Sequence, residues 1–238
     1  MAHSKTAICS TLCTADTSAV SCCMGNRPGH MQSKDSSKRL PRSINCNGCV
    51  VAYHNPWLKP GVLMKYEKGR LIFSPSDLVR YLASPFSSWM DRYRLENPGA
   101  LHPDEQTEEQ RLIAQTGNQH EQATLAVFRT SFHGMKEIGG VGFEAAEQAT
   151  ILAVRHRAPV IYQAALSDER FAGFADFLIL DQGGRYHTWD AKLARSPKPY
   201  FAVQLCCYTE MFAASTGEPM PNKFGIILGS GGRVPMPR

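Results

Sequence analysis

The chain has 238 residues, which is enough for one well-buried domain of about 150 to 200 residues with irregular ends. Apolar residues make up 43% of the chain and charged residues 20%, so most of it has the composition of a globular protein and not of a disordered one. The formal net charge of +5 weakly favours a polyanionic partner such as nucleic acid.

The lack of long apolar segments in the sequence predicts where in the cell the protein is located. No run of about 18 apolar residues occurs, and the N-terminus lacks the apolar segment of a signal peptide. We therefore expect a soluble, cytoplasmic protein that does not bind membranes. In that compartment the eight cysteines should be mostly reduced.

Residues 1–50 are rich in Ser and Cys and show no sustained helical or strand period. Cys46 and Cys49 have the spacing of half a zinc site, but a structural zinc ion needs four ligands and no second well-spaced pair stands out. We expect these residues to form a disordered tail.

Helices are predicted before the central strands. Two short ones lie on either side of the Ser84-Pro85 break, a longer one covers about 105–132, and another covers 145–156. Gly117 lies inside the long helix, where glycine costs up to about 1 kcal/mol relative to alanine. We therefore expect a close approach to the backbone at Gly117.

The second half of the chain alternates strands and helices. Strand-like runs at 158–166, 171–180 and 185–194 are separated by the polar and glycine-rich connections of hairpins. A helix at about 200–214 and a buried strand at 223–230 follow. This order predicts an α/β fold with a mixed central β-sheet flanked by helices.

Two carboxylates are predicted to meet in the second hairpin. In a hairpin around the D-Q-G-G turn, residues whose numbers sum to about 365 face one another, so Asp176 lies close to Asp190. Adjacent carboxylates repel unless a divalent cation lies between them, and oxygen ligands suit Mg²⁺. Alternation along the strand places Lys192 on the same face as Asp190, where its ammonium can approach a bound water or phosphate.

The helix at 200–214 adds Gln204 and Tyr208, which are one turn apart and can pack against Lys192 and contact phosphate. Two alternatives remain open. Asp190 and Lys192 can form a surface pair on an edge strand, although this does not explain why Asp176 lies in the most hydrophobic strand. Gln204 and Tyr208 can be the polar flank of an amphipathic helix.

Four short motifs occur in chain order, on the predicted long helix, two strands and last helix. They are Gly117-Asn118-Gln119-His120, Gly173-Phe174-Ala175-Asp176, Asp190-Ala191-Lys192 and Gln204-Leu205-Cys206-Cys207-Tyr208. Together they resemble the RecB-type nuclease branch of the PD-(D/E)xK superfamily, in particular RecB-like nucleases fused to helicases. The resemblance covers residues 72–230 and implies a restriction-endonuclease-like core with the order α-β-β-β-α-β.

The resemblance also implies roles for the motif residues. His120, Asp176, Asp190 and the carbonyl of Ala191 would bind Mg²⁺ or Mn²⁺, with Glu121 as an alternative to His120. Lys192 would position or activate the attacking water, while Gln204 and Tyr208 would hold the lysine and the DNA backbone. The expected reaction is hydrolysis of a DNA phosphodiester, at ends or in single strands, in repair or recombination.

The chain also departs from the family pattern. Members with an iron–sulfur cluster use four cysteines, but here Ser84 stands in the place of the first and no cysteine follows Cys207, so we expect no cluster. Residues 231–238 are expected to form a short tail, and the chain to be a fragment whose partner is a helicase domain or subunit. A noncatalytic DNA-binding or scaffolding module that retains the nuclease fold is the alternative function.

Overall fold

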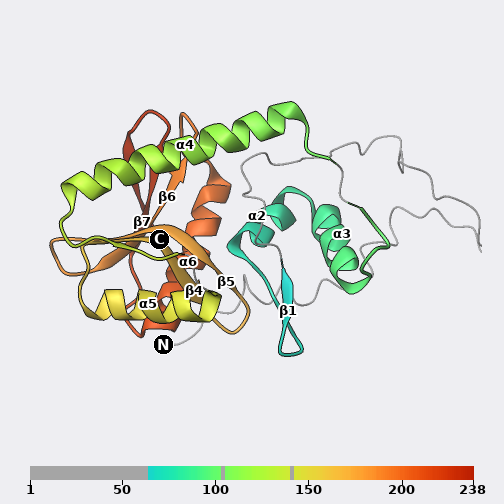
Figure 1. Cartoon of the computed structure of the whole chain (residues 1–238), viewed down its shortest axis with the longest axis horizontal. Helices are drawn as coiled ribbons and strands as arrows, with labels where there is room; N and C mark the ends of the chain where they lie inside the picture. The colour runs from blue at the N-terminus through green and yellow to red at the C-terminus, as the bar shows by residue number, and fades with distance from the viewer. Residues whose placement is uncertain (1–63, 103–104, 140–141) are drawn as a thin grey trace, which may run out of the picture. The chain divides into compact units, whose positions relative to one another are not determined.

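The computed structural model describes residues 64–102, 105–139 and 142–238 (Figure 1). The predicted tail at 1–50, with Cys46 and Cys49, lies outside the described residues. Within the described ranges no helix combines the length and the apolar character needed to cross a membrane.

The elements follow the predicted order, with additional short strands. The helices are α2 (Pro75–Ala83), α3 (Pro85–Glu96), α4 (Glu108–Ser131), α5 (Phe143–Arg155) and α6 (Pro199–Thr216). The strands are β1 (Lys65–Glu67), β2 (Arg70–Ile72), β3 (Lys136–Glu137), β4 (Val160–Ser167), β5 (Ala172–Leu180), β6 (Tyr186–Lys192), β7 (Lys223–Leu228) and β8 (Arg233–Pro237).

The main sheet has the strand order β3-β4-β5-β6-β7-β8. The pairs β3–β4 and β6–β7 are parallel, and the other pairs are antiparallel. The predicted mixed sheet flanked by helices is therefore confirmed. The prediction of a short C-terminal tail is wrong for Arg233–Pro237, because these residues form β8 along the outer side of β7.

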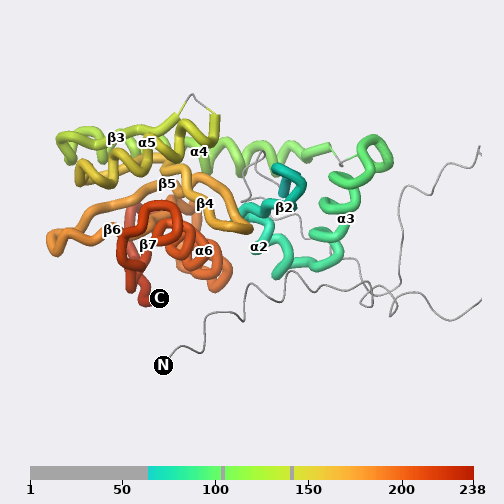
Figure 2. The backbone as a smooth tube through the Cα atoms, turned by 90° about the horizontal axis from the view of Figure 1, so that it is seen from below, coloured from blue at the N-terminus to red at the C-terminus, as the bar shows by residue number. Residues whose placement is uncertain are grey.

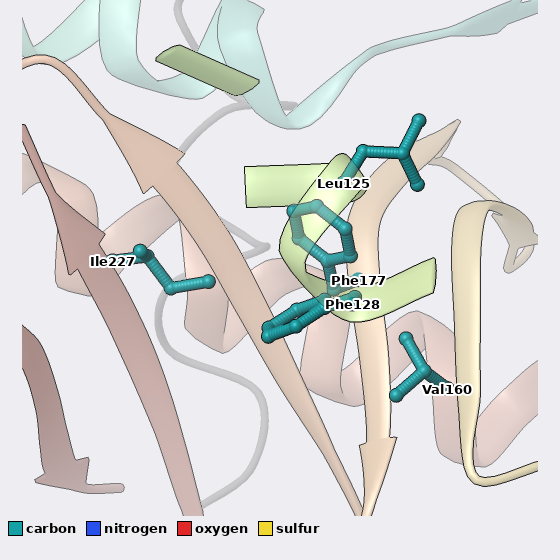
Figure 3. Packing of buried hydrophobic residues seen from close by; sticks show 5 residues of the cluster. All are labelled: Leu125, Phe128, Val160, Phe177 and Ile227. Atoms are coloured by element: carbon teal, nitrogen blue, oxygen red, sulfur yellow. The ribbon is translucent and has the colours of Figure 1, made fainter. Parts of the chain in front are cut away.

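Figure 2 shows α4 and α6 on opposite sides of β4, β5 and β6. On the α4 side, Leu125 and Phe128 pack against Val160, Phe177 and Ile227 of the sheet (Figure 3). The rings of Phe128 and Phe177 meet edge to face, with centroids 4.9 Å apart. This cluster fixes the position of α4 over the middle of the sheet.

A second cluster, on the α6 side, joins α6 to the strands at the other end of the sheet. It contains Phe201 and Leu205 of α6, together with Phe224, Ile226 and Leu228 of β7. Thr209 of α6 also hydrogen-bonds Thr188 of β6 through their hydroxyl oxygens, 2.8 Å apart. Both faces of β6 and β7 are thus covered, as the continuous apolar run of β7 predicts for that strand.

The segment before α2 is tied to the start of β5. Phe73 donates its N–H to the carbonyl of Arg170 at 2.8 Å and accepts the N–H of Ala172 at 2.9 Å. This pairing brings Pro75 to Gly173, where a Cβ atom would lie 3.1 Å from Pro75 Cδ and 3.4 Å from the hydroxyl of Tyr208. Glycine at this position therefore allows α2, β5 and α6 to meet.

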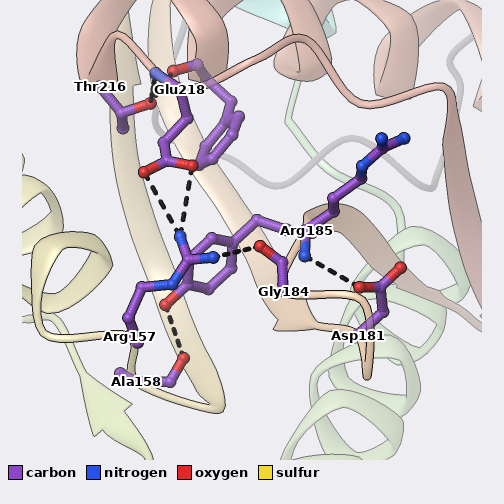
Figure 4. A network of polar contacts seen from close by, with 9 residues as sticks. Arg157, Ala158, Asp181, Gly184, Arg185, Thr216 and Glu218 are labelled. Atoms are coloured by element: carbon purple, nitrogen blue, oxygen red, sulfur yellow. Dashed lines mark hydrogen bonds and ion pairs between the residues drawn. The ribbon is translucent and has the colours of Figure 1, made fainter.

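The turn between β5 and β6 is held by a polar network (Figure 4). Arg157 donates hydrogen bonds to Glu218 and to the carbonyl of Gly184, and the Tyr186 hydroxyl donates to the carbonyl of Ala158 at 2.7 Å. Within the turn, Asp181 Oδ1 accepts the N–H of Arg185 at 2.8 Å. These contacts fix the register of the β5–β6 hairpin at its turn end.

Two glycines of the described chain lie in opposite environments. A Cβ at Gly225 would lie 2.3 Å from Cε3 of Trp189, because the indole covers this glycine on the neighbouring strand. A Cβ at Gly117 would meet no atom of the described chain within 4 Å. The described residues thus supply no close approach at Gly117, and their packing does not account for a glycine inside α4.

We predict opposite effects of alanine at these two glycines. Gly225→Ala should lower the free energy of unfolding by about 2 kcal/mol or more, because the indole must move. Gly117→Ala should raise it by up to about 1 kcal/mol, because alanine favours the helix. Urea unfolding of both variants measures the difference, and two changes of the same sign would contradict this packing.

Helix α2 begins with a buried capping box. Asp77 Oδ2 accepts the N–H of Ser74 at 2.7 Å and the Ser74 hydroxyl at 2.9 Å. The other oxygen, Oδ1, is buried and has no hydrogen-bond partner in the described chain. Burial raises the pKa of Asp77 from 3.8 to about 6, although the bonds from Ser74 oppose this shift.

We predict that Asp77 makes stability depend on pH. Because the folded protein favours the protonated acid, its contribution is complete below pH 3.8 and is lost as the pH rises through about 6. Asp77→Asn cannot titrate, so the variant should gain stability relative to the wild type between pH 4 and pH 7. Urea unfolding at both pH values measures this, and a difference that does not change with pH would contradict the burial argument.

Candidate functional site

The candidate site lies where β5 and β6 separate. Their ladder runs from Leu180 opposite Tyr186 to Phe177 opposite Trp189, so facing residues sum to 366, close to the value expected from the sequence. Beyond this pair, β5 continues beside β4 to Ala172, whereas β6 continues beside β7 to Lys192. We call this opening the strand fork.

Asp176 and Asp190 are the first residues past the end of the ladder, one on each arm of the strand fork. Asp176 Oδ2 accepts the N–H of Ala191 at 3.0 Å, so a side chain replaces the backbone pairing that ends here. Both carboxyl groups are buried, with Asp176 6% and Asp190 4% exposed. The structure therefore brings the two predicted carboxylates together.

The pKa of Asp190 is raised well above its ordinary value. Burial is the main cause, and the negative charge and hydrogen bond of Asp176 add to it. The ammonium of Lys192 acts in the opposite direction, because it favours the ionised form of Asp190. Its Nζ lies 2.7 Å from Asp190 Oδ2.

Lys192 is largely enclosed. Its side chain is 13% exposed, and its ammonium lies 5.6 Å from the ring centre of Phe201 on α6. The alternative of an exposed pair between Asp190 and Lys192 is therefore wrong. A buried ion pair of this kind needs both partners, because either charge alone would remain desolvated.

Glu121 of α4 reaches the same region through a hydrogen-bond link. Its Oε1 accepts the Tyr162 hydroxyl at 2.9 Å and the side-chain amide of Gln163 at 2.6 Å. The same amide nitrogen of Gln163 lies 3.5 Å from Asp176 Oδ1. Glu121 was only an alternative in the sequence interpretation, and Gln163 carries no motif signal.

His120 has a different environment from the neighbouring Glu121. Its Nε2 lies 3.2 Å from the carbonyl oxygen of Ile227 on β7, and its own carbonyl accepts the hydroxyl of Thr124 at 3.0 Å. The hydrogen bonds of the described chain thus link Glu121, and not His120, to the carboxylates of the strand fork. The role of His120 as a metal ligand stays a prediction.

Gln204 and Tyr208 lie on α6 and are both 8% exposed. A polar flank facing solvent, the alternative from the sequence, is therefore wrong for both residues. Tyr208 covers Gly173, three residues before Asp176 on β5. Tyr208 is thus packed against the arm of the strand fork that carries Asp176, and contacts of Gln204 with Lys192 or DNA stay a prediction.

The donor set fits a hard divalent cation that keeps part of its water shell. Asp176 and Asp190 supply two carboxylates, which is the usual protein share of a Mg²⁺ site completed by water and phosphate. In the described ranges, no group of three or more His, Cys, Asp or Glu residues is placed to hold a metal ion. A third protein ligand, whether Glu121, His120 or the carbonyl of Ala191, would therefore need a local adjustment.

Comparison with known proteins gives no family assignment. No protein-family model and no curated protein sequence matches this chain. The functional argument therefore depends on the strand fork and the side chains that it brings together.

We predict a large stability cost when the buried lysine is lost. Lys192→Met should lower the free energy of unfolding by about 3 kcal/mol at pH 8, because Asp190 loses its partner. The loss should shrink toward pH 5, because the raised pKa of Asp190 lets it accept a proton.

Urea unfolding measures this effect, with the exposed Lys136→Met as the matched control. Adding Asp190→Asn to Lys192→Met should recover most of the loss. A loss that is equal at both pH values, or that the second substitution does not reduce, would contradict the buried pair.

Proposed function

We propose that this protein is a metal-dependent deoxyribonuclease of the RecB type, a hydrolase that cleaves DNA phosphodiester bonds with Mg²⁺ or Mn²⁺. The observation that carries the proposal is the strand fork, where Asp176 and Asp190 meet and Lys192 lies 2.7 Å from Asp190. Titratable groups that are buried together and shift the pKa of one another are characteristic of functional sites.

The positions of the motifs support a restriction-endonuclease-like core. The histidine motif lies on α4, the G-x-x-D motif at the start of β5, the D-x-K motif at the end of β6 and the Q-x-x-x-Y motif on α6. Each motif belongs to a different element, and the sheet brings the two acidic motifs side by side. The order helix, hairpin strands, helix and strand agrees with the proposed core.

The chain would hold the cation with Asp176 and Asp190, and a third ligand would come from Glu121, His120 or the carbonyl of Ala191. A bound divalent cation would polarise the phosphate and lower the pKa of a water molecule. Lys192 would place its ammonium beside the phosphate, where negative charge accumulates during hydrolysis. Packing against the ring of Phe201 would limit its movement.

The proposed substrate is DNA, at ends or in single strands, and the proposed partner is a helicase domain or subunit. The net charge of +5 supports binding of a polyanion, since it attracts phosphate groups at long range. DNA repair or recombination is the process that such an activity would serve.

A second candidate function is a noncatalytic DNA-binding or scaffolding module. It is favoured by the closed pair between Asp190 and Lys192, and by the fact that no three-residue ligand group is assembled in the described ranges. Such a module would bind DNA without cleaving it and would not depend on a cation.

Incubation of the purified protein with labelled linear DNA tests the two functions. We expect cleavage with Mg²⁺ or Mn²⁺, none with EDTA, and a loss of about 100-fold or more in Asp176→Asn and Lys192→Arg. The exposed Lys223→Arg is the matched control and should cleave normally. Cleavage that persists in EDTA would exclude the proposed mechanism, and binding without cleavage would favour the second function.

A further inference from the structure

Gln163 interrupts an otherwise regular strand at the candidate site. The β4–β5 ladder pairs Tyr162 with Phe177 and Ala164 with Ala175, which leaves Gln163 opposite Asp176. Gln163 has a φ angle of 52°, in the left-handed region. A non-glycine residue rarely adopts this conformation inside a strand, and it persists where surrounding contacts impose it.

This backbone conformation redirects the side chain. Tyr162 packs into the cluster on the α4 side, so regular alternation would place the next residue on the opposite face. The amide nitrogen of Gln163 instead lies 2.6 Å from Oε1 of Glu121, which belongs to α4. The left-handed conformation of Gln163 therefore goes together with a hydrogen bond from its side chain to Glu121.

The amide lies between two carboxylate oxygens. Its nitrogen is 3.5 Å from Asp176 Oδ1 as well as 2.6 Å from Glu121 Oε1, and an NH₂ group has two hydrogens to donate. A neutral amide can satisfy both oxygens but cannot cancel their charges. A divalent cation between the same two oxygens would do both.

We propose that Gln163 is a positioning residue that keeps Glu121 and Asp176 together in the cation-free protein, and that its amide gives way to the cation. Glu121 then becomes the third protein ligand, beside Asp176 and Asp190. This inference depends on the proposed function, because it requires a divalent cation at the strand fork.

Glu121 has a second contact that keeps it in place when the amide moves. The Tyr162 hydroxyl donates to the same Oε1 at 2.9 Å, and the Gln122 amide donates to that hydroxyl at 3.0 Å. The carboxylate therefore stays oriented toward the strand fork. Movement of the Gln163 side chain would open this carboxylate toward the strand fork.

Calorimetric titration of the protein with MnCl₂ tests the inference without measuring cleavage. Removing the competing amide should tighten Mn²⁺ binding about tenfold in Gln163→Gly, because hydrogen bonds to charged groups contribute free energy of that order. Gln163→Asn should give the same gain. Asparagine also tolerates the left-handed conformation, but its shorter side chain cannot reach both carboxylates.

Two further variants complete the experiment. Gln115→Ala removes an exposed amide elsewhere on α4 that has no part in the site, so its Mn²⁺ affinity should stay within about twofold of the wild type. Glu121→Gln should weaken binding, and it should abolish the gain when it is combined with Gln163→Gly.

The outcomes separate this inference from the proposed function. If neither the wild type nor the Gln163 variants bind Mn²⁺, the proposed metal site itself is contradicted, and this inference with it. If the wild type binds and both Gln163 variants bind equally or more weakly, the role of Gln163 is wrong and the metal site stands. A gain in Gln163→Gly alone would indicate relief of the backbone conformation and would also overturn the role proposed for the amide.

Discussion

The end of the β5–β6 ladder at Phe177 and Trp189 is the constraint on which the rest of the candidate site depends. Past this pair the two strands follow different neighbours, so the backbone N–H of Ala191 lacks the partner that a continuous ladder would give. The carboxylate of Asp176 accepts this N–H at 3.0 Å. Because the N–H of Ala191 requires an acceptor, Asp176 is held inside the strand fork, where it lies beside Asp190.

The buried charges of the strand fork need neighbouring polar or charged groups. Helices α6 and α4, on opposite sides of the sheet, determine which groups these are. From the α6 side, Phe201 encloses the ammonium of Lys192, which compensates Asp190. On the α4 side, the packing of Phe128 against Phe177 fixes the helix that carries Glu121. The same apolar contacts that stabilise the fold therefore determine which polar groups reach the strand fork.

Much of this arrangement could be predicted from the sequence, because it follows from local rules. The D-Q-G-G turn determined the hairpin register within one residue, and strand alternation placed Lys192 on the same face as Asp190. The sequence did not reveal Gln163, since no local pattern predicts a left-handed glutamine within a strand.

Other features depend on contacts that are distant in sequence or on weak signals. β8 is short and contains two prolines, so its residues resemble a tail until β7 offers them a pairing edge. The proposal of Glu121 as third ligand, in place of His120, depends on Tyr162 and Gln163, about 40 residues further along the chain, whose hydrogen bonds hold the glutamate. The helical pattern alone could not distinguish two adjacent residues of α4.

For the proposed function, the charges at the strand fork imply an order in which cation and phosphate would bind. The acidic side chains of Glu121, Asp176 and Asp190 are accompanied by the single ammonium of Lys192 and by the neutral amide of Gln163. The side chains at the strand fork thus carry negative charge in excess, within a chain whose net charge is +5. A phosphate entering this region alone would meet carboxylates, and repulsion between like charges would oppose it. Under the proposed function, a divalent cation that binds first would reverse the sign of the local charge, and the strand fork would admit a DNA phosphate only after the cation has bound.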